Sequence, residues 1–278
     1  MNNFILDARI DKLQFTDSSH IVKSAVLRKL LRLPPITKNP VLIKDISLQI
    51  KQGEIVSFVG SSGAGKTTFL RVLAGLETEY TGQVIFDASI VTKPSRNTQV
   101  VFQDSKLLPW LNVRNNIAFA VENLSKSDRE SRISEWLERA DLTHLVKAFP
   151  KNLSGGEESR VAFVRVFIEP PQLLLLDEPF RALDPVTKFD LQDHFLQFVS
   201  EKKLTALIVS HSIDDAVYLS DRVIVLGRNP LHIHDTFAVT QTRPRVRGDV
   251  SLTGISVAVA ESLRRSMETK NTGGLGVL

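Results

Sequence analysis

The sequence Gly60-Ser61-Ser62-Gly63-Ala64-Gly65-Lys66-Thr67-Thr68 decides the fold class, because it joins a short apolar stretch to a segment with helical spacing. Its residues from Gly60 to Thr67 match the pattern G-x-x-x-x-G-K-[ST]. Glycines let successive backbone N–H groups approach phosphate oxygens without a Cβ in the way. Lys66 is expected to reach the β and γ phosphates, and Thr67 to offer its hydroxyl to Mg²⁺ at the positive end of the helix. The stretch therefore predicts a nucleotide phosphate site, with an incidental glycine-rich strand–helix turn as the alternative.

Two carboxylates, Asp177 and Glu178, follow the apolar run Leu173-Leu174-Leu175-Leu176. In open α/β sheets the carboxyl ends of the strands form the edge where ligands bind. Asp177 is expected to hold Mg²⁺, and Glu178 to polarise the water that attacks the γ-phosphate. The alternative is an exposed acid pair that ends a strand, and the phosphate loop upstream argues against it.

The composition restricts the function classes. The 278 residues include no cysteine, which excludes disulfides, zinc–thiolate sites, iron–sulfur clusters and a cysteine nucleophile. The net charge of +4 is too small to indicate a nucleic acid partner. Asp7 and Asp11 stand where a secretion signal needs an apolar core, and no run approaches the ~18 apolar residues of a membrane span. We therefore expect a chain that is cytosolic or held on a membrane from the cytosolic side.

Apolar patterning alternates between the periods of strands and helices along most of the chain. This alternation predicts an α/β fold with a mostly parallel sheet, interrupted between 104 and 168 by an all-helical insert. Strands are expected over 3–15, 41–50, 54–59, 83–86, 98–102, 173–177, 205–210 and 222–226. Helices are expected over 66–74, 113–122, 128–140, 155–168, 185–200 and 213–219.

A second glycine turn, Ser154-Gly155-Gly156, opens one of these helices. By itself it is an ordinary helix N-cap or a second anion-binding helix terminus. Three motifs follow one another along the chain: the phosphate loop, this glycine turn and the segment Leu173–Pro179. With these motifs in this order, the chain resembles the ATP-binding subunits of ABC transporters. The resemblance covers nearly the whole chain, from Phe4 to Ser266.

The resemblance implies a P-loop NTPase (RecA-like) fold with an N-terminal antiparallel β subdomain and an α-helical insert. We expect a single ABC ATPase domain over residues 1–270, followed by a flexible tail at 271–278. Its parts are a catalytic core with the β subdomain at 1–103 and 169–235, a helical signature subdomain at 104–168, and a C-terminal linker and helix at 236–270.

Four further residues match positions of that family. Gln103 looks like the glutamine that contacts Mg²⁺ or water, with a polar strand-end residue as the alternative. His211 looks like the histidine that contacts the γ-phosphate, although a lone strand-end histidine is more often structural. Asp184 resembles the aspartate that crosses the dimer interface, and it can also be the N-cap of the next helix. Phe15 is a candidate to stack on adenine, or else a core residue of its strand.

The resemblance also implies partners and a mechanism. Two ATP-binding subunits, as a homodimer, face each other head to tail, and each ATP lies between Lys66 of one and Ser154–Gly156 of the other. ATP-driven closure and hydrolysis then drive transmembrane permease subunits, whose coupling helix docks on the helical insert. The chain is expected to be peripheral on the cytoplasmic side of the inner membrane, with an extracytoplasmic solute-binding protein as an indirect partner.

The segment Leu107-Leu108-Pro109-Trp110 is similar to the nitrate, sulfonate and taurine importers, although several importer branches share such packing. A small anion of that kind is the expected cargo, but an ATPase does not touch cargo, so the sequence does not name it. An importer of another solute, an exporter ATPase, an ABC protein acting on DNA or ribosomes, and an ATP-gated scaffold without turnover remain as alternatives.

The chain departs from the family at three places. Arg181 stands where a small residue is usual, and Glu157 and Glu158 follow the signature glycines in place of uncharged or basic residues. A carboxylate beside a partner's ATP should oppose phosphate binding. The segment 20–38 is unusually long and basic, and it either touches lipid or the permease, or covers the N-terminal strands with its basic face in water.

Overall fold

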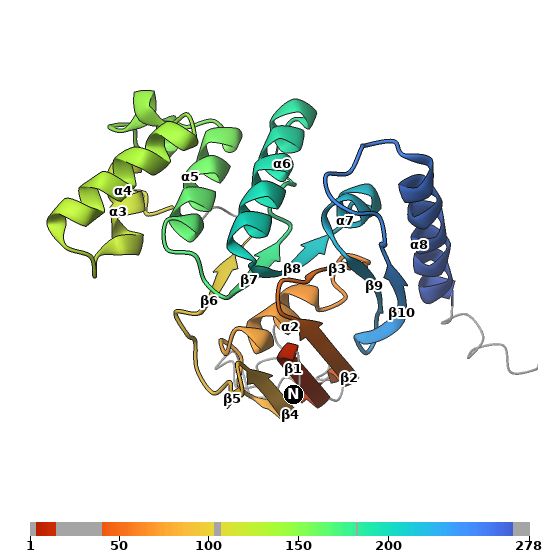
Figure 1. Cartoon of the computed structure of the whole chain (residues 1–278). Coiled ribbons are helices and arrows are strands. Elements are labelled where there is room, and N and C mark those ends of the chain that lie inside the picture. The colour runs from red at the N-terminus through yellow and green to blue at the C-terminus, as the bar shows by residue number, and fades with distance from the viewer. Residues whose placement is uncertain (1–3, 15–40, 103–106, 182, 269–278) are drawn as a thin grey trace, which may run out of the picture.

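The computed structural model describes residues 4–14, 41–102, 107–181 and 183–268, and the predicted mostly parallel sheet forms its centre (Figure 1). The strand order is β10-β9-β3-β8-β7-β6, and each neighbouring pair is parallel except β9 with β10. All residues of β3, β7 and β8 are buried, as expected for strands covered on both faces. The strands are β3 (Ile55–Gly60), β6 (Thr98–Val101), β7 (Leu173–Asp177), β8 (Thr205–Ser210), β9 (Arg222–Gly227) and β10 (His232–Ala238).

A second, antiparallel sheet lies against the first, with α2 (Lys66–Leu73) between them (Figure 1). Its order is β2-β1-β4-β5, with β1 (Phe4–Gln14), β2 (Val41–Lys51), β4 (Tyr80–Phe86) and β5 (Ser89–Ile90). One apolar cluster joins strands of both sheets to α2, and the Phe58 and Phe69 rings stack within it at 5.6 Å. The phosphate loop therefore stands on a helix that is held from both sides.

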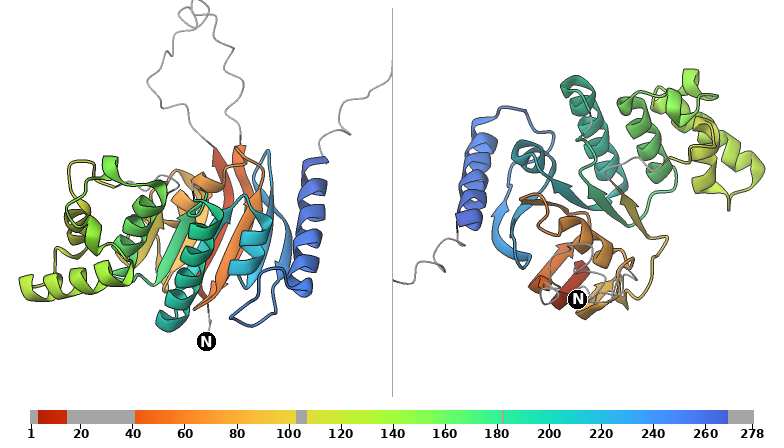
Figure 2. Two further views of the ribbon diagram at one scale, coloured as in Figure 1. Left: turned by 90° about the horizontal axis from the view of Figure 1, so that it is seen from above. Right: turned by 180° about the vertical axis from the view of Figure 1, so that it is seen from behind.

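The remaining helices form two groups (Figures 1 and 2). The first group covers the other face of the parallel sheet and contains α6 (Pro185–Lys202), α7 (Ile213–Leu219) and α8 (Val250–Glu268). The second group has its own apolar cluster and contains α3 (Val113–Ala118), α4 (Lys126–Arg139) and α5 (Gly155–Phe167). The helix predicted over 113–122 ends at Ala118 and continues as a 3₁₀ turn, Phe119–Val121; two further 3₁₀ turns are Thr143–Leu145 and Pro150–Asn152.

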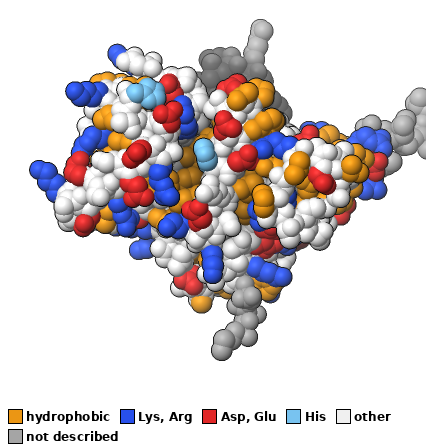
Figure 3. Space-filling view, turned by 45° about the horizontal axis from the view of Figure 1, so that its top comes forward, with side chains coloured by type: hydrophobic (Ala, Val, Ile, Leu, Met, Phe, Trp, Pro, Cys, Tyr) orange, Lys and Arg blue, Asp and Glu red, His pale blue; other side chains and the backbone are white. Residues whose placement is uncertain are grey.

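Aromatic side chains join the two helical groups. Phe163 and Phe167 of α5 pack against Phe195 and Phe198 of α6, with the Phe167 and Phe198 centroids 4.2 Å apart. Large rings bury much apolar area for little lost rotamer freedom, so this contact holds the α3–α5 group on the parallel sheet. Across the described residues no helix is long and apolar enough to cross a membrane. Acidic and basic side chains are interspersed over the face shown in Figure 3.

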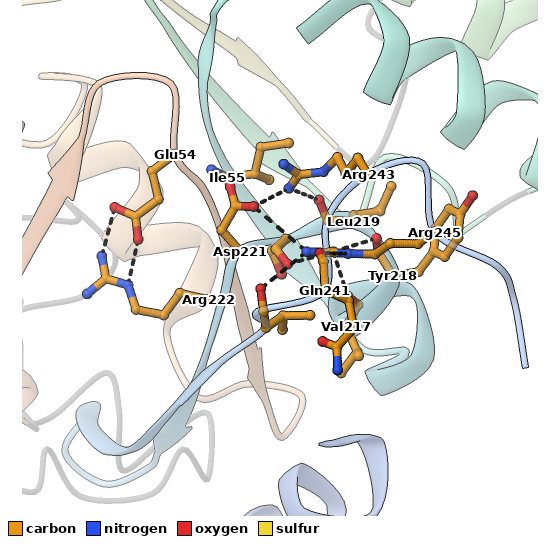
Figure 4. A network of polar contacts seen from close by, with 12 residues as sticks. Glu54, Ile55, Val217, Tyr218, Leu219, Asp221, Arg222, Gln241, Arg243 and Arg245 are labelled. Carbon is orange, nitrogen blue, oxygen red and sulfur yellow. Dashed lines mark hydrogen bonds and ion pairs between the residues drawn. The ribbon is translucent and has the colours of Figure 1, made fainter. Parts of the chain in front are cut away.

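A buried arginine closes the carboxyl end of α7 (Figure 4). The Arg245 side chain is 1% exposed, and its Nη1 donates to the carbonyl oxygens of Val217, Tyr218 and Ser220 at 2.8 to 3.0 Å. Its neighbour Arg243 donates to Leu219 O and pairs with Asp221. These carbonyls have no partner within the helix, because a helix leaves its last carbonyl groups unpaired. Burial lowers the Arg245 pKa to about 10, still well above neutral pH.

We predict that Arg245→Met lowers the free energy of unfolding by about 3 kcal/mol, because it removes one charged donor and leaves several buried carbonyl groups unpaired. Chemical denaturation followed by circular dichroism measures this. Arg264→Met is the control, because the side chain of Arg264 is 71% exposed and pairs with Glu268 on the same helix. Equal effects of the two substitutions would contradict the prediction.

Candidate nucleotide site

The phosphate loop connects the end of β3 to the start of α2. Gly63 and Gly65 have φ angles of +72° and +99°, which residues with a Cβ rarely adopt. A Cβ on Gly60 would lie 3.0 Å from the carbonyl oxygen of Leu226 in β9, so the loop also needs a glycine for space there. The loop backbone thus needs glycine at these positions, and a loop of this kind can direct backbone N–H groups towards an anion.

Lys66 is turned back into this loop. Its ammonium donates to the carbonyl oxygens of Gly60 and Ser61, both at 2.9 Å, and the residue is 6% exposed. Burial lowers the Lys66 pKa, and the carboxylates of Glu178 and Asp177 partly offset that effect. A buried ammonium hydrogen-bonded to neutral carbonyl oxygens is well suited to bind a polyanion, because charged phosphate oxygens are stronger acceptors than the carbonyl oxygens they would replace.

Asp177 ends β7 directly beside the start of α2. The Thr67 hydroxyl donates to Asp177 Oδ2 at 2.7 Å, which brings two of the three predicted Mg²⁺ ligands into contact. Burial raises the Asp177 pKa, while the Thr67 hydroxyl and Lys66 favour the charged form. A hydroxyl and a carboxylate are oxygen donors of the kind that Mg²⁺ selects, so these residues fit that ion.

Glu178 and His211 meet at the same edge of the sheet, because they follow the adjacent parallel strands β7 and β8. The Glu178 side chain is 14% exposed, and its Oε2 lies 3.4 Å from Nδ1 of His211. The Glu178 backbone has φ +50° and donates its N–H to Val209 O at 2.9 Å. This strained conformation is held by the neighbouring strand.

A second group of predicted residues gathers where α5 and α6 begin. Ser154 is the N-cap of α5 and Asp184 is the N-cap of α6, where Asp184 Oδ1 accepts from Val186 N and Thr187 N at 3.1 Å. A Cβ on Gly156 would lie 3.1 Å from the Thr187 side chain, so the two helix starts are packed together. The hydroxyl and backbone N–H of Thr187 lower the pKa of Asp184.

Glu157 already occupies two donors of the Ser154 turn. Its Oε2 accepts from the Ser154 backbone N–H at 2.7 Å and from the Ser154 hydroxyl at 2.9 Å, forming a capping box. These hydrogen bonds lower the Glu157 pKa, so the carboxylate is charged at neutral pH. The helix terminus predicted to bind an anion therefore holds an anion of its own chain.

Sequence reasoning found these residues but missed one contact. Arg181 was noticed for its unusual residue type, and the structure gives it a partner, because its Nη1 lies 2.8 Å from Glu178 Oε2. The spacing of three residues between a glutamate and an arginine is the signal that could have indicated this pair. Two predicted residues, Phe15 and Gln103, and the basic segment 20–38 lie outside the described residues.

Comparison with known proteins shows the family of the chain. The "ABC transporter" family model matches residues 43–181. An aliphatic sulfonates import ATP-binding protein of Xanthomonas axonopodis pv. citri is 44% identical over 74% of this chain and 83% of its own length. A protein of the same description from Bacillus cereus (strain ATCC 10987 / NRS 248) is 37% identical over 82% of this chain and 91% of its own. A solved dimeric ATP-binding cassette, described as a post-hydrolysis state bound to ADP and phosphate, has the same fold, with a TM-score of 0.70 at 24% identity over 85% of this chain and 100% of its own.

The fold and the family match define an ATPase of the P-loop class, in which the helices α3–α5 are inserted between β6 and β7. The chain belongs to the ABC transporter family, as an ATP-binding subunit of the branch that includes the aliphatic sulfonate importers.

We predict that Asp177→Asn makes the nucleotide-free protein more stable at neutral pH. Because burial raises the pKa of Asp177, the native state binds more protons than the unfolded chain between the two pKa values. The unfolding free energy therefore falls as pH rises through that window. Asparagine removes this cost, so the gain should shrink as the pH is lowered towards the ordinary aspartate pKa.

Denaturation midpoints measured at several pH values test this. The matched control is Asp193→Asn, because burial raises the Asp193 pKa but hydrogen bonds from Arg247 and Tyr218 lower it overall. That substitution should destabilise the protein at neutral pH and lose its effect in acid. Two variants with the same sign at neutral pH would contradict the interpretation.

Proposed function

We propose that this ATPase energises the import of a small anion, an aliphatic sulfonate or a related solute, through a separate permease. The observation that carries the proposal is the division of the site. Lys66, Thr67, Asp177, Glu178 and His211 form one group, while the Ser154 turn stands on another helix beside Asp184. Such a division suits a site that a second subunit completes. The printed descriptions of the relatives supply the import direction and the solute class.

The described residues suggest a role for each member of the first group. Lys66 binds the β and γ phosphates in place of the carbonyl oxygens of its own loop. Thr67 and Asp177 would hold Mg²⁺, which neutralises phosphate charge when bound. Gln103, outside the described residues, is expected to contact Mg²⁺ or water as well. Glu178 accepts a hydrogen bond from the attacking water and orients it, and His211 donates to the γ-phosphate.

The second group serves the other subunit of a head-to-tail homodimer. In that arrangement the Ser154–Gly156 helix start faces the γ-phosphate held by the partner, and Asp184 lies at the interface. Support comes from the exposure of both segments and from their contact with each other. Helix termini bind anions through free N–H groups, so the second subunit adds donors to a phosphate that the first already holds.

The α3–α5 group suits the permease contact. The segments that lead into and join its helices expose three large aromatic residues, Trp110 at 69%, Phe119 at 51% and Phe149 at 40%, and exposed aromatic side chains are enriched in protein interfaces. The chain then works as a peripheral subunit on the cytoplasmic face of the inner membrane. An extracytoplasmic protein selects the solute, because the ATPase does not contact it.

We predict that the chain, released from native membranes with detergent, copurifies with a permease of membrane-spanning subunits after a high-salt wash, and mass spectrometry identifies the partners. A Trp110→Ala variant should lower the yield of permease, because the ring buries apolar area at that contact.

Trp136→Ala is not a suitable control, since Trp136 belongs to the aromatic contact with α6. Ile90→Ala is the matched control, because Ile90 is an exposed apolar residue of the antiparallel sheet. Recovery of soluble or ribosomal partners alone would overturn the transport proposal.

We predict that Glu157→Gln strengthens ATP-driven dimer formation about fivefold, which corresponds to ~1 kcal/mol of charge repulsion after screening. The carboxylate holds the two donors of Ser154 that a partner's phosphate needs, and an amide holds them without the negative charge. Light scattering at increasing ATP concentration measures the dimer, in a Glu178→Gln background that slows hydrolysis. Glu138→Gln, on the exposed face of α4, is the charge-matched control. Equal dimer affinity for Glu157→Gln and its parent would reject the idea.

A further inference from the structure

The ion pair between Arg181 and Glu178 lies inside the hydrolytic group. We propose that Arg181 is a positioning residue for ATP hydrolysis, which holds the Glu178 carboxylate so that the His211 imidazole stays available to the nucleotide. This inference rests on the roles proposed above for Glu178 and His211.

Arg181 and His211 face the same carboxylate oxygen. Arg181 Nη1 lies 2.8 Å from Glu178 Oε2, and His211 Nδ1 lies 3.4 Å from it. A hydrogen bond between two charged groups is shorter and stronger than one from a neutral imidazole, so the guanidinium is the preferred partner of Oε2. The other oxygen, Oε1, is left to accept a hydrogen bond from water.

The backbone fixes Arg181 over this carboxylate. The N–H of Arg181 donates to Glu178 O at 3.2 Å, which closes a turn directly after β7. Glu178 itself is fixed by its bond to Val209 O and its positive φ. The backbone of both residues is therefore fixed by hydrogen bonds. Forming the ion pair then costs only side-chain conformational entropy.

The other charged groups nearby do not replace the guanidinium. Asp215 lines the same small pocket as Glu178, Arg181 and His211, but its carboxylate pairs with Lys188 at 3.1 Å. Lys66 acts on Glu178 only through space, because its ammonium is bound to the carbonyl oxygens of the phosphate loop. Without Arg181, Oε2 would have the His211 ring as its nearest donor.

The test is steady-state ATP hydrolysis by the full chain carrying Arg181→Ala or Arg181→Lys. We expect Arg181→Ala to lower kcat several-fold with KM for ATP unchanged, because the ATP-binding loop keeps its contacts while His211 turns to Glu178. Arg181→Lys should restore part of the rate, since an ammonium still pairs with the carboxylate. Arg264→Ala removes the same charge from the exposed face of α8 and should change neither constant.

A second readout needs no nucleotide. The ring chemical shifts of His211 in NMR spectra, assigned with His211→Gln, should change in Arg181→Ala, because the imidazole then turns to Glu178 Oε2. A purely structural surface pair would leave these chemical shifts unchanged.

The outcomes distinguish the role proposed for Glu178 from the positioning role inferred for Arg181. If Glu178→Gln retains full hydrolysis, the role proposed for Glu178 fails, and the inference about Arg181 fails with it. If Glu178→Gln abolishes hydrolysis but Arg181→Ala has the parent kcat and the parent His211 chemical shifts, only the inference about Arg181 is overturned. A higher kcat in Arg181→Ala would also overturn it.

Discussion

The parallel pairing of β3, β8 and β7 is the constraint on which the site depends. Strands that run in the same direction end at the same edge, so the residues that follow them meet although they are far apart in the sequence. The phosphate loop follows β3, the two carboxylates follow β7, and His211 follows β8. The hydrogen bond between Thr67 and Asp177 joins two of these strand ends. A shift of one residue in either register would move a functional side chain to the other face of the sheet.

This edge concentrates charge that burial makes costly. Lys66 and Asp177 are each buried, and their pKa values move in the directions that oppose ionisation. Nearby opposite charges partly offset the free-energy cost of burying these ionised groups. A bound polyanion with its cation would offset the rest. The site is therefore adapted to its ligand rather than to the stability of the free chain, as is common for catalytic groups.

The second group of residues shows how packing joins the parts of the molecule. The starts of α5 and α6 touch at Gly156 and Thr187, and the phenylalanine rings farther along both helices keep the α3–α5 group on the core. A displacement of the α3–α5 group would therefore move both Asp184 and the Ser154 turn. The C-terminal linker acts on the other side, where Arg247 pairs with Asp193 of α6 and lies over the ring of Tyr218 in α7.

Local sequence determined much of this protein. The loop from Gly60 to Thr67 and the strand ending in Asp177 and Glu178 are contiguous patterns, and their chemistry depends on residue type and spacing. The sheet and most helix positions followed from apolar periodicity, and the helix over 213–219 has the predicted bounds. The family was recognisable for the same reason. The break after Ala118 was missed, because a change from α to 3₁₀ geometry leaves the apolar spacing almost unaltered.

Only the tertiary structure decided which side chains pair with which. Arg181 was a conspicuous residue in the sequence, but its contact with Glu178 depends on a turn whose φ angle is held by β8. Glu157 was expected to repel phosphate, and the fold adds that it occupies the donors of Ser154. Arg245 was one basic residue among several in the linker, until folding buried it against the end of α7. Such pairings depend on distances between distant segments, which no local pattern encodes.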